Sequence, residues 1–121
     1  MADFAAWLGQ GAAISEAERA AKAWRRIQDK PTSIVFRKPG GGTVGAQTVR
    51  IESDSMATPA ESAAGLAPKR KAIVFGVRNH PSVTDTDMAE GYTFVLANDE
   101  YRCLDVILTL GEVQGIFEAT G

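Results

Sequence analysis

The sequence predicts a mainly β fold, a small antiparallel β-barrel or sandwich of about six strands with an N-terminal α-helix and long loops. Residues 91–121 read as a three-stranded antiparallel meander. Further upstream, three runs are rich in the β-branched and aromatic residues that strands prefer. Residues 15–30 instead show the three- and four-residue apolar spacing of a helix. At 121 residues, the chain is predicted to be a single domain, 1–121.

Residues 1–14 are predicted to form an N-terminal arm ahead of the helix. Within this arm, residues 3–8 are a candidate short helix with an apolar face made of Phe4, Trp7 and Leu8. Such a face needs something to cover it. In a monomer the cover would be the barrel, and in an assembly it would be a neighbouring subunit.

The main helix is predicted over residues 15–30. Ser15-Glu-Ala-Glu18 has the form of a capping box, which predicts that the helix begins at Ser15. Pro31 predicts that it ends near Asp29 or Lys30. Between these limits the apolar residues recur at helical spacing: Ala17, Ala20, Ala21, Trp24 and Ile27.

Residues 32–121 are predicted to form the barrel, because after Pro31 the apolar period changes from 3.6 to 2. The first three strands are predicted at 32–38, 47–52 and 71–77. The loops 39–45 and 53–69 separate them. The second loop is long for so small a domain, and its only large apolar residues are Met56 and Leu66. We expect it to become ordered only against a partner.

The C-terminal meander is predicted from three further runs, at 91–97, 100–108 and 112–119. Asn98-Asp99 is the predicted loop of the first hairpin, because Asn and Asp tolerate the positive φ of tight hairpin turns. Leu110-Gly111 is the predicted loop of the second.

The charge is nearly balanced but unevenly distributed. The net charge of −2 does not indicate general affinity for nucleic acid or for membrane surfaces. Residues 1–50 hold eight Lys/Arg and four Asp/Glu, giving +4, whereas residues 51–121 hold five and eleven, giving −6. This asymmetry favours head-to-tail packing of copies.

Cys103 is the only cysteine, so the chain has no internal disulfide and no thiolate zinc site. This indicates a reducing compartment. The first residues lack the basic region of a signal peptide, and no run approaches the ~20 apolar residues of a membrane span. We therefore expect the protein to be assembled in the cytoplasm, without a membrane.

Two loops contain candidate chemical motifs. Gly40-Gly-Gly42 with Gly45 is similar to a phosphate-binding loop, but the Lys-Ser/Thr that opens a helix is missing, so a turn is favoured. His80, Asp85 and Asp87 offer an imidazole and two carboxylates on one loop. Without a second histidine or a glutamate pair this is a poor metal cage, and a solvated loop is favoured.

Neither catalysis nor cofactor binding is predicted. A nucleophilic pair would require Cys103, inside a strand, to meet His80, inside a loop, and thiols in strands are usually small apolar residues. We therefore expect the protein not to be an enzyme.

Nucleic-acid contact remains an alternative at two basic sites. One is the helix end with Arg25, Arg26 and Lys30 around Trp24, and the other is the run 69–71. A solvated helix face and a strand entrance are the favoured interpretations, and Trp24 is favoured as a core residue over a stacking platform.

Three parts of the sequence carry a family resemblance. The first is the helix that runs into the strand Ile34-Val-Phe-Arg37, and the second is the strand Gln47-Thr-Val-Arg-Ile-Glu52. The third is a C-terminal pattern that begins with Asp87-Met-Ala-Glu-Gly-Tyr-Thr-Phe-Val-Leu96. It continues through Glu100-Tyr-Arg-Cys-Leu-Asp-Val106 and Gly111-Glu-Val-Gln-Gly115. Together they resemble the small head-closure, or head–tail joining (connector), proteins of tailed bacteriophages. The chain departs from the family pattern at two places: Tyr92 stands where the family often has Asp, and Cys103-Leu104 replaces the usual Val after Tyr101.

The resemblance implies a structural virion protein in the neck, at the head–tail interface. It implies a homo-oligomeric, twelvefold ring beneath the portal or its adaptor, which closes the head after packaging of double-stranded DNA and receives the tail proteins. It implies no catalytic residue, cofactor or metal. The alternatives are a tail terminator or tail-completion ring, and a small nucleic-acid-binding β-barrel. The residues expected at subunit or ring interfaces are Trp7, Arg25, Arg26, Met56, Leu66, Lys69, Arg70 and Lys71.

Overall fold

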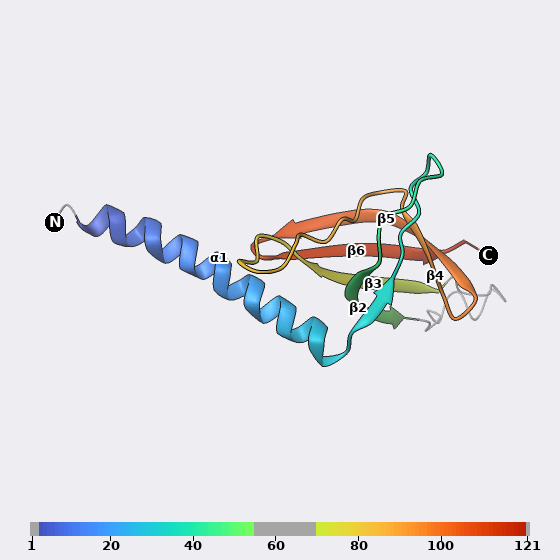
Figure 1. The fold of residues 1–121 in the computed structure, drawn as a ribbon, viewed down its shortest axis with the longest axis horizontal. Helices are drawn as coiled ribbons and strands as arrows, with labels where there is room; N and C mark the ends of the chain where they lie inside the picture. The colour runs from blue at the N-terminus through green and yellow to red at the C-terminus, as the bar shows by residue number, and fades with distance from the viewer. Residues whose placement is uncertain (1–2, 55–69, 121) are drawn as a thin grey trace, which may run out of the picture.

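The structure is a computed structural model that describes the backbone of residues 3–54 and 70–120 and the side chains of residues 16–52 and 70–120. Figure 1 shows one long helix beside a curved layer of strands. The elements in chain order are α1 (Asp3–Asp29), β1 (Thr32–Ile34), β2 (Gln47–Asp54), β3 (Lys71–Val77), β4 (Thr93–Leu96), β5 (Asp99–Thr109) and β6 (Glu112–Ala119).

The strands form a sheet that closes almost completely into a barrel. Its order is β1-β2-β3-β6-β5-β4, and every neighbouring pair is antiparallel. The two outer strands meet just beyond β1, where Arg37 and Thr93 exchange N–H···O bonds of 2.8 and 2.9 Å. The predicted fold class is confirmed. These two bonds pair backbone groups at the seam that an open sheet edge would leave without a partner.

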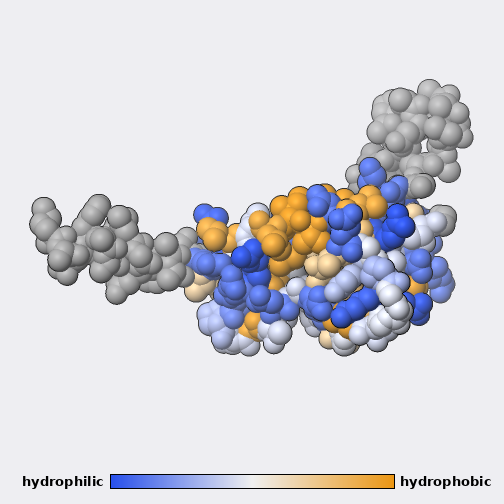
Figure 2. Space-filling model, turned by 90° about the horizontal axis from the view of Figure 1, so that it is seen from above, coloured by the Kyte–Doolittle hydropathy of each residue, from blue (hydrophilic) through white to orange (hydrophobic). Residues whose placement is uncertain are grey.

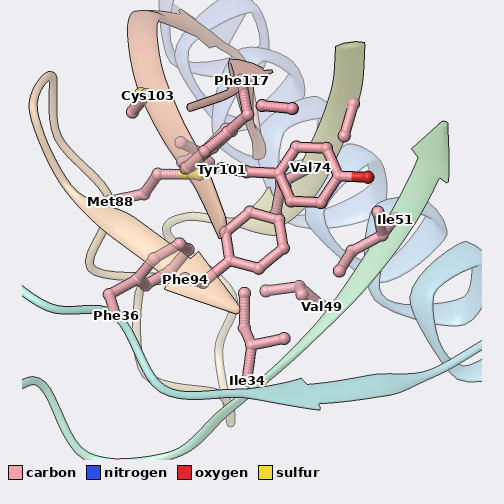
Figure 3. Packing of buried hydrophobic residues seen from close by; sticks show 13 residues of the cluster. Ile34, Phe36, Val49, Ile51, Val74, Met88, Phe94, Tyr101, Cys103 and Phe117 are labelled. Atoms are coloured by element: carbon pink, nitrogen blue, oxygen red, sulfur yellow. The ribbon is translucent and has the colours of Figure 1, made fainter. Parts of the chain in front are cut away.

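Four aromatic rings form the centre of the barrel core (Figure 3). The ring of Phe94 lies 5.0 Å from Phe117, 5.3 Å from Tyr101 and 6.0 Å from Phe36, measured between centroids. These edge-to-face and stacked arrangements are favourable for aromatic pairs. Aliphatic side chains from β1, β2, β3 and β6, together with one methionine, surround them: Ile34, Val49, Ile51, Val74, Val113 and Met88.

The C-terminal half of α1 packs against the barrel. Ala20, Ala23 and Ile27 are buried against Val77 at the end of β3, and Trp24 lies at the edge of this cluster. The N-terminal half of the helix runs away from the barrel in Figure 1. The contact between helix and barrel is therefore confined to the part of α1 nearest the first strand.

The helix predicted over residues 15–30 is confirmed, but α1 does not begin at Ser15, because it extends further toward the N-terminus and covers Asp3–Asp29. The arm at 1–14 and the helix at 15–30 are thus not separate elements, and the short helix expected at 3–8 is part of α1. A capping box indicates only a local preference for a helix to begin at that residue. The chain before it holds alanines and no proline, so a helix propagates through it. The predicted end near Asp29 is confirmed, with Pro31 two residues later.

The first hairpin of the meander turns one residue earlier than predicted. Its loop is Ala97-Asn98, with φ of 51° and 69°, and Leu96 pairs with Asp99. This register places Phe94 opposite Tyr101, so packing of the two inward rings decides the loop position. The second loop, Leu110-Gly111, is where it was predicted, since Thr109 pairs with Glu112.

The strand bounds differ from the prediction mainly around the seam of the barrel. β1 ends at Ile34, although the chain stays beside β4 through Arg37. β4 covers Thr93–Leu96 of the predicted 91–97. β2 and β3 contain the predicted runs 47–52 and 71–77.

The two predicted loops have different outcomes. Residues 39–45 form a turn that projects from the barrel in Figure 1; Lys38 N–H donates to Gly42 O at 2.7 Å, and Gly41 has φ of 98°. The turn favoured for the glycine cluster is confirmed. The predicted loop 53–69 overlaps β2 at its first two residues, and residues 55–69 lie outside the described residues.

Candidate functional site

The segment 78–91 connects β3 to β4 and carries the polar side chains that were candidates for metal binding. His80 uses Nδ1 to accept a hydrogen bond from the Ser82 N–H at 2.9 Å. Its ring lies edge-on to Trp24, with centroids 6.5 Å apart. His80 is therefore part of the contact between this segment and α1.

The two carboxylates of the segment also hold the loop together. Asp85 Oδ1 accepts the N–H of Asn79 at 2.8 Å, and Asp87 Oδ1 accepts the hydroxyl of Tyr92 at 3.1 Å. Burial raises the pKa of Tyr92, as does its bond to Asp87. Over residues 16–52 and 70–120, no group of three or more His, Cys, Asp or Glu is arranged to hold a metal ion.

Gln47 fastens this segment to the barrel. Its Oε1 accepts the N–H of Asp87 at 2.7 Å, and its Nε2 donates to the carbonyl of the same residue at 3.0 Å. Thr86 adds two bonds to Val77, one from its N–H to the carbonyl and one from the Val77 N–H to its Oγ1, both 2.9 Å. The segment is thus an ordered part of the barrel wall, and Met88 enters the core from it.

A hollow of about 430 Å³ lies between α1, the start of β2 and this segment. Its lining includes Trp24, Gln47, Thr48, Val83, Asp85 and Thr86. Gln47, Asp85 and Thr86 already make the loop-fastening bonds described above. The lining offers no nucleophile paired with a base, which is the arrangement that covalent catalysis uses.

Cys103 and His80 belong to different parts of the fold. Cys103 is 1% exposed and lies in the barrel core, whereas His80 lies beside Trp24 at the helix. Burial raises the pKa of the Cys103 thiol to about 11. A thiol held neutral in this way is a small apolar core residue and a poor nucleophile.

The raised pKa of Cys103 predicts a loss of stability in alkali. The unfolded thiol ionises near its ordinary value of 9.0, whereas the folded thiol stays neutral up to about 11. Above pH 9 the unfolded state therefore releases a proton that the folded state retains, which favours unfolding. We expect the urea midpoint to fall between pH 9 and 11. Cys103→Ala is expected to show a shallower fall over this range, and identical slopes for the two proteins would contradict the assignment.

The predicted interface residues are not gathered in one place. Arg25 and Arg26 lie on α1, which packs at the Val77 end of β3, whereas Arg70 and Lys71 lie at the opposite end of that strand. Four of the predicted residues lie outside the described side chains: Trp7, Met56, Leu66 and Lys69.

Two of the predicted arginines form ion pairs within the chain. Arg26 lies 3.5 Å from Glu112, and Arg70 lies 2.7 Å from Asp99. Both arginine side chains are more than half exposed, so each pair contributes only ~0–1 kcal/mol and is readily exchanged for another partner. Arg25 and Lys71 are exposed.

The sequence analysis missed an apolar surface on the outside of the barrel. We call it the outer face, and it consists of Ile73, Phe75, Leu104, Ile107 and Ile116. Ile73 and Leu104 are each 39% exposed, and Ile107 is 41% exposed. A signal was present, because β3 has an apolar residue or glycine at every position from 72 to 77. Such a run is typical of a strand covered on both faces.

Within the described part of the chain, no helix is long and apolar enough to cross a membrane. Comparisons with protein-family models, with curated proteins and with solved structures find no match to this chain.

Proposed function

We propose that the protein is a structural component of a tailed-phage virion, one subunit of the connector ring that closes the head between the portal or adaptor and the tail. The observation that carries this proposal is a nearly closed barrel with an aromatic core and with exposed apolar residues on its outside. The outer face is apolar and open to solvent, and both α1 and the 39–45 turn project from the barrel (Figure 1). The sequence pattern of the meander adds the family resemblance.

The exposed surfaces fit a protein that works by assembly. Exposed apolar patches on small soluble domains usually mark protein contacts. Seven large apolar residues are more than a third exposed among the side chains that the structure describes. A subunit of a ring needs two different complementary surfaces, and projecting elements together with an open sheet face provide them.

The polar residues support a role without chemistry. Three side chains that line the hollow beside α1, namely Gln47, Asp85 and Thr86, hold the segment 78–91 in place. The thiol of Cys103 is buried and has a raised pKa. We propose that the protein is not an enzyme and binds no cofactor.

In this proposal the ring contacts the portal or adaptor on one side and the tail on the other, and packaged DNA passes through its centre. Two elements are proposed to contact neighbouring rings or to line the channel, namely the 39–45 turn and the loop 53–69. Most of the second lies outside the described residues. A tail-terminator ring would use the same barrel. The nucleic-acid-binding barrel is less favoured, because residues 51–121, which form most of the barrel, carry a net charge of −6.

The test is mass spectrometry of virions that have been separated into heads, tails and complete particles. We expect the polypeptide in DNA-filled heads and complete particles and not on free tails. The capsid and tail-tube proteins serve as markers for the purity of each fraction. Enrichment on free tails would favour the terminator ring. Absence from every fraction would overturn the structural role and make single-stranded DNA binding the next measurement.

A further inference from the structure

The outer face is built by the register of three strands. Ile73 of β3 lies opposite Ile116 of β6, which lies opposite Asp105 of β5. One step along, Phe75, Gln114 and Ile107 form the next row. Residues directly opposite each other in an antiparallel pair point to the same side of the sheet. The face is therefore a continuous surface two rows deep, extended by Leu104 at the bulge in β5.

Nothing among the described residues of the same chain covers this surface. The neighbours of these residues along the strands, Val74 and Phe117 among them, point into the core, so the face points outward. α1 lies over the next row, at Val77 of β3 and at Glu112 of β6, whose carboxylate is 3.5 Å from Arg26. The rows of Ile73 and Phe75 remain outside this contact. Figure 2 shows apolar surface along the body of the molecule, between the helix and the far end of the barrel.

The N-terminal half of α1 has the length to cover such a face. Residues 3–15 precede the packed part of the helix and span about 20 Å at 1.5 Å per residue. The sequence of this half places Phe4, Trp7 and Leu8 at the three- and four-residue spacing of an apolar stripe. Three strands with the usual separation of ~4.8 Å span about 10 Å, so a helix of three to four turns crosses them completely.

This half of the helix cannot cover the face of its own barrel. The buried residues Ala20 and Ile27 fix α1 on the barrel, and the helix continues from there away from the strands (Figure 1). A second copy of the chain is the occupant that the geometry allows.

We propose that the N-terminal half of α1 of one copy packs across the outer face of β3, β6 and β5 of a second copy. The contact is head-to-tail, since helix and face are different surfaces, and such contacts close into rings when the rotation permits. The proposal rests on the proposed function in one respect, because it identifies the contact between neighbouring subunits of the ring.

The test uses two full-length variants and measures association by sedimentation velocity over a range of concentrations. Trp7→Glu disables the helix stripe and keeps the face, whereas Ile107→Asp disables the face and keeps the stripe. We expect the unmodified chain to self-associate and each variant alone to do so at least tenfold more weakly. An equimolar mixture of the two variants is expected to form a heterodimer, because one supplies the face and the other the helix.

Val35→Asp is the matched control. Val35 is 48% exposed, against 41% for Ile107, and it lies beside β1, on the other side of the barrel from β6. This variant is expected to associate as the unmodified chain does. Circular dichroism and thermal unfolding establish that each variant is folded, and Leu104→Asp replaces Ile107→Asp if the latter does not fold.

Three outcomes would overturn the contact. The first is an unmodified chain that stays monomeric up to about 1 mM, a concentration at which only contacts weaker than ~4 kcal/mol escape detection. The second is a pair of variants that associate as well as the unmodified chain. The third is a mixture without heterodimer, which means that the helix of one copy and the face of the other do not meet. The connector role is judged separately. A chain found in virions but monomeric by these measurements overturns this contact alone, and a chain that associates as proposed but is absent from virions overturns the connector role alone.

Discussion

Replacing Gly111 with alanine is expected to lower the free energy of unfolding by about 2–4 kcal/mol. Gly111 lies in the turn between β5 and β6 with φ of 76°, a backbone conformation that residues other than glycine adopt only at an energetic cost. A Cβ at this position would also meet the backbone of α1, at the Ala20 nitrogen and at the Arg19 carbonyl carbon 2.9 Å away. Backbone atoms of a packed helix cannot move aside as a flexible side chain can. The cost of the steric overlap therefore adds to the cost of the positive φ.

The measurement is urea denaturation of Gly111→Ala beside Gly40→Ala. Gly40 lies in the projecting turn, has no positive φ, and nothing lies within 4 Å of its would-be Cβ. Gly40→Ala is therefore expected to be neutral or slightly stabilising, because it only restricts the unfolded chain. Equal stability of the two variants would show that the β5–β6 turn does not press on the helix.

Truncating Phe94 to alanine is expected to cost about 3–5 kcal/mol, the usual loss for a buried phenylalanine. The side chain is 1% exposed, and its ring contacts three of the other core aromatics, namely Phe36, Tyr101 and Phe117. A cavity at this point would leave all three without a partner on one side. Because a domain of this size is stable by only about 5–15 kcal/mol, the loss is a large part of the total.

Val95→Ala, one residue along the same strand, is the control for Phe94→Ala. Val95 points outward and is 51% exposed, so its truncation is expected to change the free energy of unfolding by no more than about 0.5 kcal/mol. Both variants are compared in urea at the same pH. A Phe94→Ala protein as stable as Val95→Ala would mean that the aromatic cluster does not carry the core.

These two predictions locate stability in the barrel interior and at the junction of barrel and helix. The surfaces proposed for assembly lie elsewhere, on the outer face and on the projecting half of α1. Substitutions such as Ile107→Asp are therefore expected to separate assembly from folding. This separation is what makes the association experiment interpretable.

The strands were predictable because their apolar residues alternate locally. β2, β3 and β6 contain the predicted runs, and Leu110-Gly111 is the loop where it was expected. The end of α1 at Asp29 was equally readable, since Pro31 acts on its immediate neighbours. Signals of this kind need no knowledge of the rest of the chain.

The start of the helix and the first hairpin loop were not predictable in the same way. Ser15 carries a good local signal for a helix start, but the residues before it continue the helix. Asn98-Asp99 suits a tight loop, but stacking of Phe94 on Tyr101 selects Ala97-Asn98. In both places a weak local preference, worth about 1 kcal/mol, is outweighed by propagation or packing.

The sequence by itself determined the mainly β class, the number of strands and their order along the chain, and the patterns on which the connector resemblance rests. Only the tertiary structure decided which strands are neighbours, that β1 and β4 meet at Arg37 and Thr93, that Arg26 and Arg70 have partners in the same chain, and that an apolar face remains on the outside. Alternation and turn residues act over a few positions, so one sequence contains them. Strand pairing, ion pairs and exposed faces arise from residues far apart in the chain, and their positions are fixed only when the whole barrel closes.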